Sequence, residues 1–218
     1  MLDRTFIRPI AHRGLHEPSR GLLENTAPAF AAAIADGHGI ECDLQPAAGG
    51  LPVVFHDETI DRLMDATGPV RSLSRGDLDR LRYRGSAEPI LIYSDLLDLV
   101  AGRVPLLVEI KSVWAPPDLD FLGQIADASR GYRGPLALMS FDPAVMAVVR
   151  ELAPGIARGI VSGSYQGEGW WSNVLGETRR QALSHLLESG PANPDFYAYH
   201  VADLPTPVTR FVREVLGV

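Results

Sequence analysis

The amino-acid sequence predicts a parallel α/β fold, and three observations support this prediction. Segments of strand length alternate with helical segments through most of the 218 residues. The connections between them are short, and polar residues recur where the strands end. No repeat, low-complexity tract or linker divides the chain. We therefore expect a single domain over residues 1–218, with its functional side chains at the carboxyl ends of the strands.

The first strand–helix–strand unit occupies the N-terminal part of the chain. Phe6–His12 reads as a strand that ends in polar residues, and Ala29–Ala35 is a strong helix former. Asn25 is the expected N-cap of this helix. The strand Gly39–Leu44 follows directly, and two strands joined by a helix in this way favour parallel pairing.

Two acidic residues lie inside the strand Gly39–Leu44. Because side chains alternate along a strand, Glu41 and Asp43 share one face, while Cys42 points to the other. On a solvated face, this pattern would be an ordinary half-exposed strand. Inside a closed sheet, two neighbouring carboxylates would require a cation between them. The strand by itself leaves both interpretations open.

A further polar residue follows the next short strand. Leu51–Phe55 ends at His56, which taken alone also fits a hydrogen-bonded structural residue. The segment from residue 58 to residue 92 is irregular. Within it, Leu73–Leu81 reads as a short helix capped by Ser72 or Ser74.

A second charged pair occurs on the strand Val104–Lys111, which follows an expected helix from Ser94 to Val100. Glu109 and Lys111 alternate onto one face, where they could also form an ion pair on a solvated edge. Beyond this strand we expect helix 118–129, strand Leu136–Ser140, helix Pro143–Leu152, strand Ala157–Ser162, helix Trp170–Glu188, strand Phe196–His200 and helix Pro205–Leu216. The count of barrel-type strands is six.

The composition limits the kinds of partner that the protein can bind and indicates where in the cell it is expected. A net charge of −7 argues against general binding to nucleic acid or anionic membranes, because both need clustered Lys and Arg. Cys42 is the only cysteine, so no internal disulfide forms, and its apolar neighbours predict a buried small side chain. The N-terminus lacks an apolar signal core, and no apolar run has the length of a membrane span. We expect a cytoplasmic protein.

The strand ends together provide a set of residues with a common chemistry. They supply His12, Arg13, Glu41, Asp43, His56, Glu109 and Lys111. Three carboxylates without a thiolate suit a hard divalent cation, Mg2+ or Ca2+. The two histidines can exchange protons near neutral pH, and the two basic residues can face an anion. This combination indicates a site for phosphoryl chemistry.

The order and spacing of these residues resemble the glycerophosphodiester phosphodiesterase family, within the superfamily of phospholipase C-like phosphodiesterases. The resemblance covers residues 10–111 with specific motifs and the remainder through the order of elements. The matching motifs are His12-Arg13-Gly14, Glu24-Asn25-Thr26, Gly39-x-Glu41-x-Asp43, Val53-Val54-Phe55-His56-Asp57, Arg62-Leu63, Thr67-Gly68 and Glu109-Ile110-Lys111.

The resemblance implies a TIM (β/α)8-type barrel with a small insertion after the second strand, at about residues 45–102. It implies metal-dependent hydrolysis of glycerophosphodiesters to sn-glycerol 3-phosphate and an alcohol. The implied metal ligands are Glu41, Asp43 and Glu109. The implied catalytic pair is His12 and His56, and the implied phosphate contacts are Arg13 and Lys111.

Two departures from the family pattern qualify this interpretation. A TIM barrel needs eight strand–helix units and about 250 residues. We count six units, so we expect the last two to be absent and the chain to be less stable than a complete barrel would be. Leu91-Ile92-Tyr93 also stands where the family often has Pro-Thr-Leu, which leaves that wall of the site undefined.

Two other functions fit the same residues. The first is cleavage of a lysophospholipid or phosphoinositide headgroup, which an exposed apolar rim near the site would favour. The second is a barrel that binds a phosphorylated ligand without turnover. At this stage we assign Trp170 and Trp171 to packing and Asp57 to a surface cap or pair.

Overall fold

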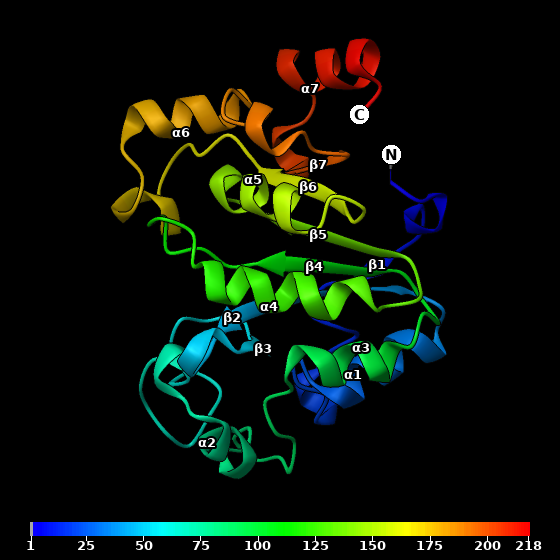
Figure 1. Ribbon diagram of the computed structural model, residues 1–218, viewed down its shortest axis with the longest axis vertical. Coiled ribbons are helices and arrows are strands. Elements are labelled where there is room, and N and C mark those ends of the chain that lie inside the picture. Colours follow the sequence, from blue (N-terminus) through cyan, green and yellow to red (C-terminus); the bar gives the residue numbers. More distant parts are fainter. Residues whose placement is uncertain (1) are drawn as a thin grey trace.

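The structure, a computed structural model that describes residues 2–218, is organised around one curled sheet (Figure 1). In the described residues the sheet has seven strands, of which six run in parallel in the order β1-β2-β4-β5-β6-β7. The remaining strand, β3, pairs antiparallel with β2. The prediction of a parallel α/β fold is confirmed, and the sheet has the form of a half-barrel.

The strands are β1 (Ile10–Ala11), β2 (Gly39–Pro46), β3 (Pro52–Val54), β4 (Leu106–Ile110), β5 (Leu136–Ser140), β6 (Ala157–Ser162) and β7 (Phe196–Tyr199). The α-helices are α1 (Ala27–Ala35), α2 (Arg75–Arg80), α3 (Tyr93–Val100), α4 (Leu119–Arg130), α5 (Pro143–Leu152), α6 (Glu177–Ser184) and α7 (Pro207–Phe211). Short 3-10 helices occupy Arg4–Phe6, Pro18–Arg20, Ala48–Gly50, Val70–Ser72, Trp170–Asn173, Gly190–Ala192 and Val201–Asp203, and a π-helical turn, Val212–Leu216, continues α7.

Helix α5 shows how local sequence sets these elements. Asp142 caps it by accepting a hydrogen bond from the Ala144 backbone N–H, and Pro143 takes the first helical position, where no donor is needed. Val145 and Val149 are buried at helical spacing and face the core. The helix therefore begins where its sequence predicts and is held by one apolar stripe.

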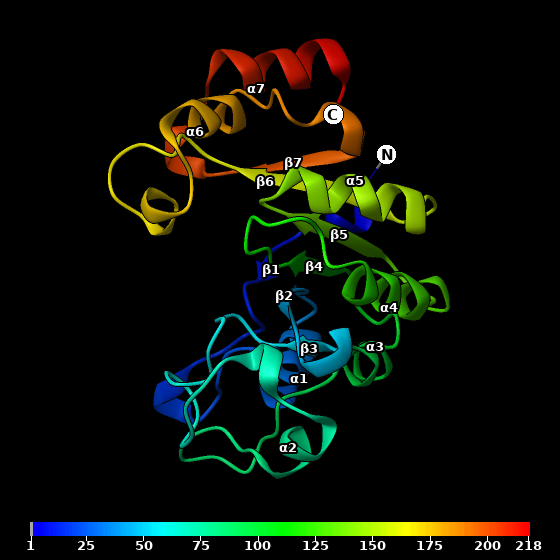
Figure 2. The ribbon, with the colours of Figure 1, turned by 60° about the vertical axis from the view of Figure 1, so that its left-hand side comes forward.

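The main core lies between the sheet and its covering helices. Figure 2 shows α3, α4 and α5 stacked along one face of the sheet. The β2 residues that point to this face, Ile40, Cys42 and Leu44, are fully buried. Because strand side chains alternate, Glu41 and Asp43 point to the opposite face, the inside of the curl. Cys42 is the buried small side chain that the sequence predicts.

A smaller core stabilises the segment that follows β3. Phe55, Ile60, Met64 and Tyr83 are buried together, and the Phe55 and Tyr83 ring centroids lie 6.0 Å apart. The short helix α2 in this segment has a capping box in which Ser74 accepts from the Asp77 N–H. Ser74, one of the two expected caps, is therefore the one used.

Two expectations for the first unit are wrong. The first strand comprises Ile10–Ala11 alone, because the preceding residues form a 3-10 turn over Arg4–Phe6. The N-cap of α1 is Thr26, and Asn25 lies one residue earlier with φ 57°. Asn25 is held in this conformation by tertiary contacts described below, which override its local preference for capping.

The expected helix from Trp170 to Glu188 is also wrong as one element. It is divided into a 3-10 turn over Trp170–Asn173 and helix α6, with Gly176 as the N-cap of α6. Val174, in the break, is 49% exposed rather than buried. In the described part of the chain, no helix combines the length and apolarity that a membrane crossing requires.

Candidate functional site

Three carboxylates meet on the inner face of the sheet. Asp43 of β2 and Glu109 of β4 are direct partners in the parallel register, and Glu41 lies two residues before Asp43 on the same face. All three are buried, and each offers an oxygen within 4.8 Å of those offered by the others. The strand pairing thus brings together the three predicted metal ligands from two distant segments.

The acidic triad, Glu41, Asp43 and Glu109, is electrostatically unfavourable without a cation. Burial and the nearby charges of Asp43 and Glu109 raise the pKa of Glu41 to about 8. Burial also raises the pKa of Glu109, although Lys111 opposes this shift. Glu41 Oε1 is buried and accepts no hydrogen bond in the described structure. A hard divalent cation fits this cluster, because it would supply the missing partner and balance the charge.

Lys111 provides positive charge at the edge of the triad. Its Nζ lies 2.5 Å from Glu109 Oε1 and 2.7 Å from Asp43 Oδ1. Burial alone would lower the pKa of Lys111, but the charges of Glu109 and Asp43 outweigh burial and raise it. Lys111 therefore stays cationic next to the carboxylates and can also face an anionic ligand.

Arg13 contacts the triad through both its backbone and its side chain. With φ at 57°, its N–H donates to Glu41 Oε2 at 3.0 Å. Its guanidinium donates to Glu24 Oε1 at 2.9 Å, and Nε lies 3.3 Å from Asp43 Oδ2. Arg13 consequently orients two of the three acids, in addition to being available for an anion.

Asn25 and Glu24 belong to the site, although sequence reasoning gave Asn25 only a capping role. Asn25 Nδ2 donates to Asp43 Oδ2 at 2.9 Å, and Asn25 is almost fully buried. Burial alone would raise the pKa of Glu24, but hydrogen bonds and charge from Arg62 and Arg13 lower it to about 2. Both lie in the Glu24-Asn25-Thr26 motif, which was the available signal in the sequence.

The two histidines lie on the side of the site formed by β1 and β3. His12 Nε2 is 3.9 Å from Glu41 Oε2, and the imidazole is largely exposed. Surrounding protein atoms, followed by the charge of Arg13, lower the pKa of His12. His56 is half-buried, and its backbone carbonyl accepts a hydrogen bond from Gln45 Nε2 at 3.0 Å, which ties the end of β3 to β2.

A chain of charged groups connects His56 to the triad. His56 Nδ1 is 2.6 Å from Asp57 Oδ1, and Asp57 Oδ2 accepts from Arg62 Nε at 2.6 Å. Arg62 in turn donates to both oxygens of Glu24 at 2.7 and 2.9 Å. Burial would raise the pKa of Asp57, but these hydrogen bonds lower it. Asp57 is therefore more than a surface pair, because it orients the His56 ring.

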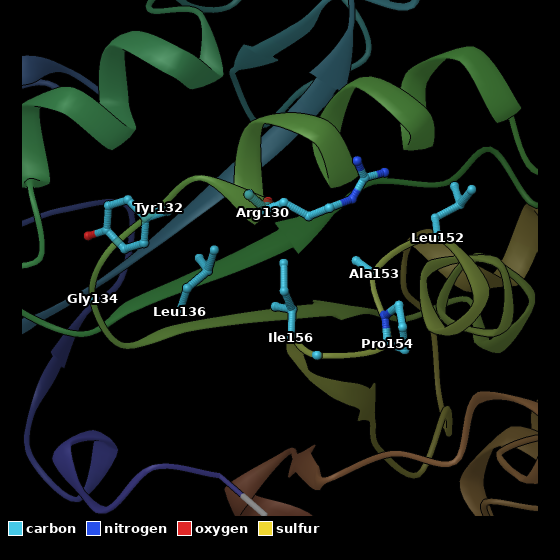
Figure 3. Close-up of a pocket in the computed structure, with 10 residues that line it drawn as sticks. Arg130, Tyr132, Gly134, Leu136, Leu152, Ala153, Pro154 and Ile156 are labelled. Carbon is cyan, nitrogen blue, oxygen red and sulfur yellow. The ribbon is translucent and has the colours of Figure 1, made fainter.

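A cavity at the other end of the sheet is unrelated to this site. Figure 3 shows a cavity of about 420 Å³ lined by residues such as Arg130, Tyr132, Leu136 and Ile156. Leu136 is the first residue of β5, so the cavity opens at the amino ends of the strands. The carboxylates and histidines lie at the carboxyl ends, where parallel α/β folds place their chemistry.

Comparison with known proteins identifies relatives. The model of the glycerophosphoryl diester phosphodiesterase family matches residues 12–182. A glycerophosphodiester phosphodiesterase of Caldanaerobacter subterraneus is 29% identical over 163 residues, which cover 70% of this chain and 65% of the relative. The chain thus spans slightly less than two thirds of that relative's length.

Solved structures show the same fold. A structure from Galdieria sulphuraria matches with a TM-score of 0.73 and 21% identity, covering 97% of this chain and 81% of the other. An Oleispira antarctica phosphodiesterase in complex with the product sn-glycerol-3-phosphate matches with a TM-score of 0.67 and 21% identity, covering 96% and 79%.

Proposed function

Since the chain belongs to the glycerophosphoryl diester phosphodiesterase family, we propose that it hydrolyses glycerophosphodiesters to sn-glycerol 3-phosphate and an alcohol. The observation that carries this proposal is the acidic triad, whose buried oxygens lie within 4.8 Å of one another. Lys111 and Arg13 add positive charge beside it. A cation site together with fixed positive charge near the phosphoryl group stabilises the charge that develops in phosphodiester cleavage.

In this proposal, Glu41, Asp43 and Glu109 hold Mg2+ or Ca2+. When bound, the cation neutralises phosphoryl charge and makes the phosphorus more electrophilic. Lys111 and Arg13 contact the phosphoryl oxygens and stabilise charge that grows on them. Asn25 and Arg13 hold Asp43 and Glu41 in the orientation that a ligand set requires.

His12 and His56 are the proposed acid–base pair. The lowered pKa of His12 keeps its imidazole neutral near pH 7, so that it can accept a proton. Asp57 holds His56 through Nδ1, which leaves Nε2 to exchange a proton with the substrate or with water. The usual acid–base range assigns each histidine a factor of about 10² to 10⁴ in rate.

Release of glycerol 3-phosphate from glycerophosphocholine, followed with glycerol-3-phosphate dehydrogenase, tests this function. Activity should depend on Mg2+ or Ca2+ and should fall by more than about 10² in His12→Ala. Glu41→Gln should lose activity, whereas the matched change Glu151→Gln, on the exposed side of α5, should retain it. Full activity after exhaustive treatment with a chelator would contradict the proposal.

A further inference from the structure

Aromatic side chains begin one strand away from Lys111, at the same end of the sheet. Glu109 of β4 is paired in register with Met139 of β5. Phe141 lies two residues beyond Met139, as Lys111 lies two residues beyond Glu109, so both point to the inner face. Neighbouring strands are about 4.8 Å apart. The strand register therefore places Phe141 one strand away from Lys111, on the same face of the sheet.

Trp114, Phe141, Tyr165 and Trp170 form what we call the aromatic wall. They follow β4, β5 and β6, and Trp170 is at the centre of the group. Its ring centroid is 5.4 Å from Phe141 in an edge-on arrangement, 5.8 Å from Trp114 in a stacked one, and 6.4 Å from Tyr165. In Figure 1 the turn before α6 lies at the end of the sheet toward which the β4 arrow points.

The wall is held firmly and lies within electrostatic range of the triad. The Arg179 guanidinium carbon is 5.0 Å from the centroid of the Trp114 ring, and Arg179 also pairs with Glu188 at 3.2 Å. Tyr165 is buried, and burial, with smaller contributions from charges that include Glu109, raises its pKa to about 12. The wall is thus linked to α6 through Arg179 and to the interior through the buried Tyr165.

The central ring of the aromatic wall is open to solvent. Trp170 is 46% exposed in spite of its ring contacts. Val113, which precedes Trp114, is 50% exposed, and Val174, four residues after Trp170, is 49% exposed. Exposed apolar side chains gathered around an aromatic cluster are a candidate ligand or partner site. Trp171 packs against Tyr165 and Trp170 packs against four aromatic rings, as expected, but Trp170 also keeps 46% of its surface exposed.

The chemistry of the wall favours a hydrocarbon over a quaternary ammonium group. Cations bind to free aromatic faces, but Arg179 already lies over Trp114 and Trp170 stacks on the same ring. A second cation would meet the charge of Arg179. A hydrocarbon has no such conflict, and the exposed Val113 and Val174 offer further apolar side chains close in sequence to Trp114 and Trp170.

We propose that the aromatic wall binds the acyl chain of a monoacyl glycerophosphodiester while the acidic triad and Lys111 bind its phosphate. This inference rests on the proposed hydrolysis and specifies its substrate class. The reaction is the same: water adds to phosphorus, the bond from phosphorus to the unacylated alcohol breaks, and that alcohol leaves with a proton. The product is an acylglycerol phosphate, which keeps its chain on the wall.

A chain-length series tests this proposal. Choline release is measured for glycerophosphocholine and for its short- and medium-chain monoacyl forms, below their micelle concentrations. In the unmodified protein, kcat/KM should rise with chain length, by up to about fourfold for each fully buried methylene. Trp170→Ala should reduce this slope, and Trp170→Phe should restore part of it. Phe211→Ala removes an aromatic residue on α7 that is 52% exposed and should keep the full slope.

The outcomes separate this inference from the proposed function. Failure to release choline from any member of the series would overturn the proposed hydrolysis, and the inference with it. Release that is independent of chain length would overturn the inference alone. The inference would also be overturned if kcat/KM rose equally with chain length in the unmodified protein and in Trp170→Ala, because the acyl chain would then bind elsewhere.

Discussion

Competition between a proton and the metal at Glu41 is the most quantitative consequence of the site. A carboxylate must be ionised to bind a cation, so metal affinity falls where that carboxylate is protonated. The pKa of Glu41 is raised to about 8, first by burial and then by Asp43 and Glu109. The metal must therefore displace a proton throughout the neutral range.

The magnitude follows from this pKa of about 8. Well above pH 8 no proton has to be displaced, and below it the apparent Kd rises about tenfold for each pH unit. Between pH 9 and pH 6, the apparent Kd should increase about 100-fold, which corresponds to about 2.7 kcal/mol. Near pH 7, binding of one cation should release the proton held by Glu41.

The same shift fixes the sign of the pH dependence of stability in the metal-free protein. The pKa of Glu41 in the folded protein lies above its unfolded value of 4.5. The stability that protonation of Glu41 gives the folded state is therefore fully present below about pH 4.5 and is lost as pH rises through about 8. A bound cation removes this loss. Unfolding midpoints measured between pH 6 and 9 should therefore diverge with and without the metal.

Isothermal titration calorimetry measures both Kd and proton release when Mg2+ or Ca2+ is titrated at several pH values and in buffers of different ionisation enthalpy. Glu41→Gln should bind weakly and lose the pH dependence, whereas His12→Ala should keep it, because the pKa of His12 is lowered from 6.5. A Kd that changes less than about threefold between pH 6 and 8 would refute the reasoning.

Three further predictions concern residues around the site and in the scaffold. Asp57→Asn should lower kcat by about 10- to 100-fold without loss of metal binding, because the His56 ring loses its orienting carboxylate; a pH–rate profile measures this. Gly14→Ala should lower the free energy of unfolding in urea by about 2 kcal/mol, because φ is 78° and the new Cβ would lie 2.9 Å from the α1 backbone. The control Gly21→Ala, at φ 74° with nothing within 4 Å of the new Cβ, should lower it by about 1 kcal/mol. Arg158→Ala should lower the stability measured by thermal unfolding by about 2–4 kcal/mol, because the buried guanidinium donates to backbone carbonyls. Metal affinity should be retained, because Arg158 lies on the side of β6 remote from the triad.

Much of the candidate site was visible in the sequence because its residues follow a strand rule. Glu41 and Asp43 are two residues apart on one strand, as are Glu109 and Lys111, and alternation places each pair on a single face. The carboxyl ends of parallel strands meet at one end of a sheet, so the pairs had to converge. In the structure these four residues lie together.

The partners of these residues could not be read in the same way. Asn25 looks like a helix cap in its local sequence, but its backbone has φ 57° and its amide donates to Asp43, 18 residues away. Arg62 lies 38 residues from Glu24, to which it donates two hydrogen bonds. Such pairs depend on loop paths, which carry no periodic signal in the sequence.

The sequence by itself determined the fold class, the position of most strands and helices, and the identity of the acids that form the triad, because these depend on periodicity and strand alternation. Only the tertiary structure decided which groups orient those acids and where the aromatic side chains gather. Trp114, Phe141 and Trp170 lie on three separate loops. They form one surface because β4, β5 and β6 are adjacent and parallel, a relation that strand register sets and local sequence does not encode.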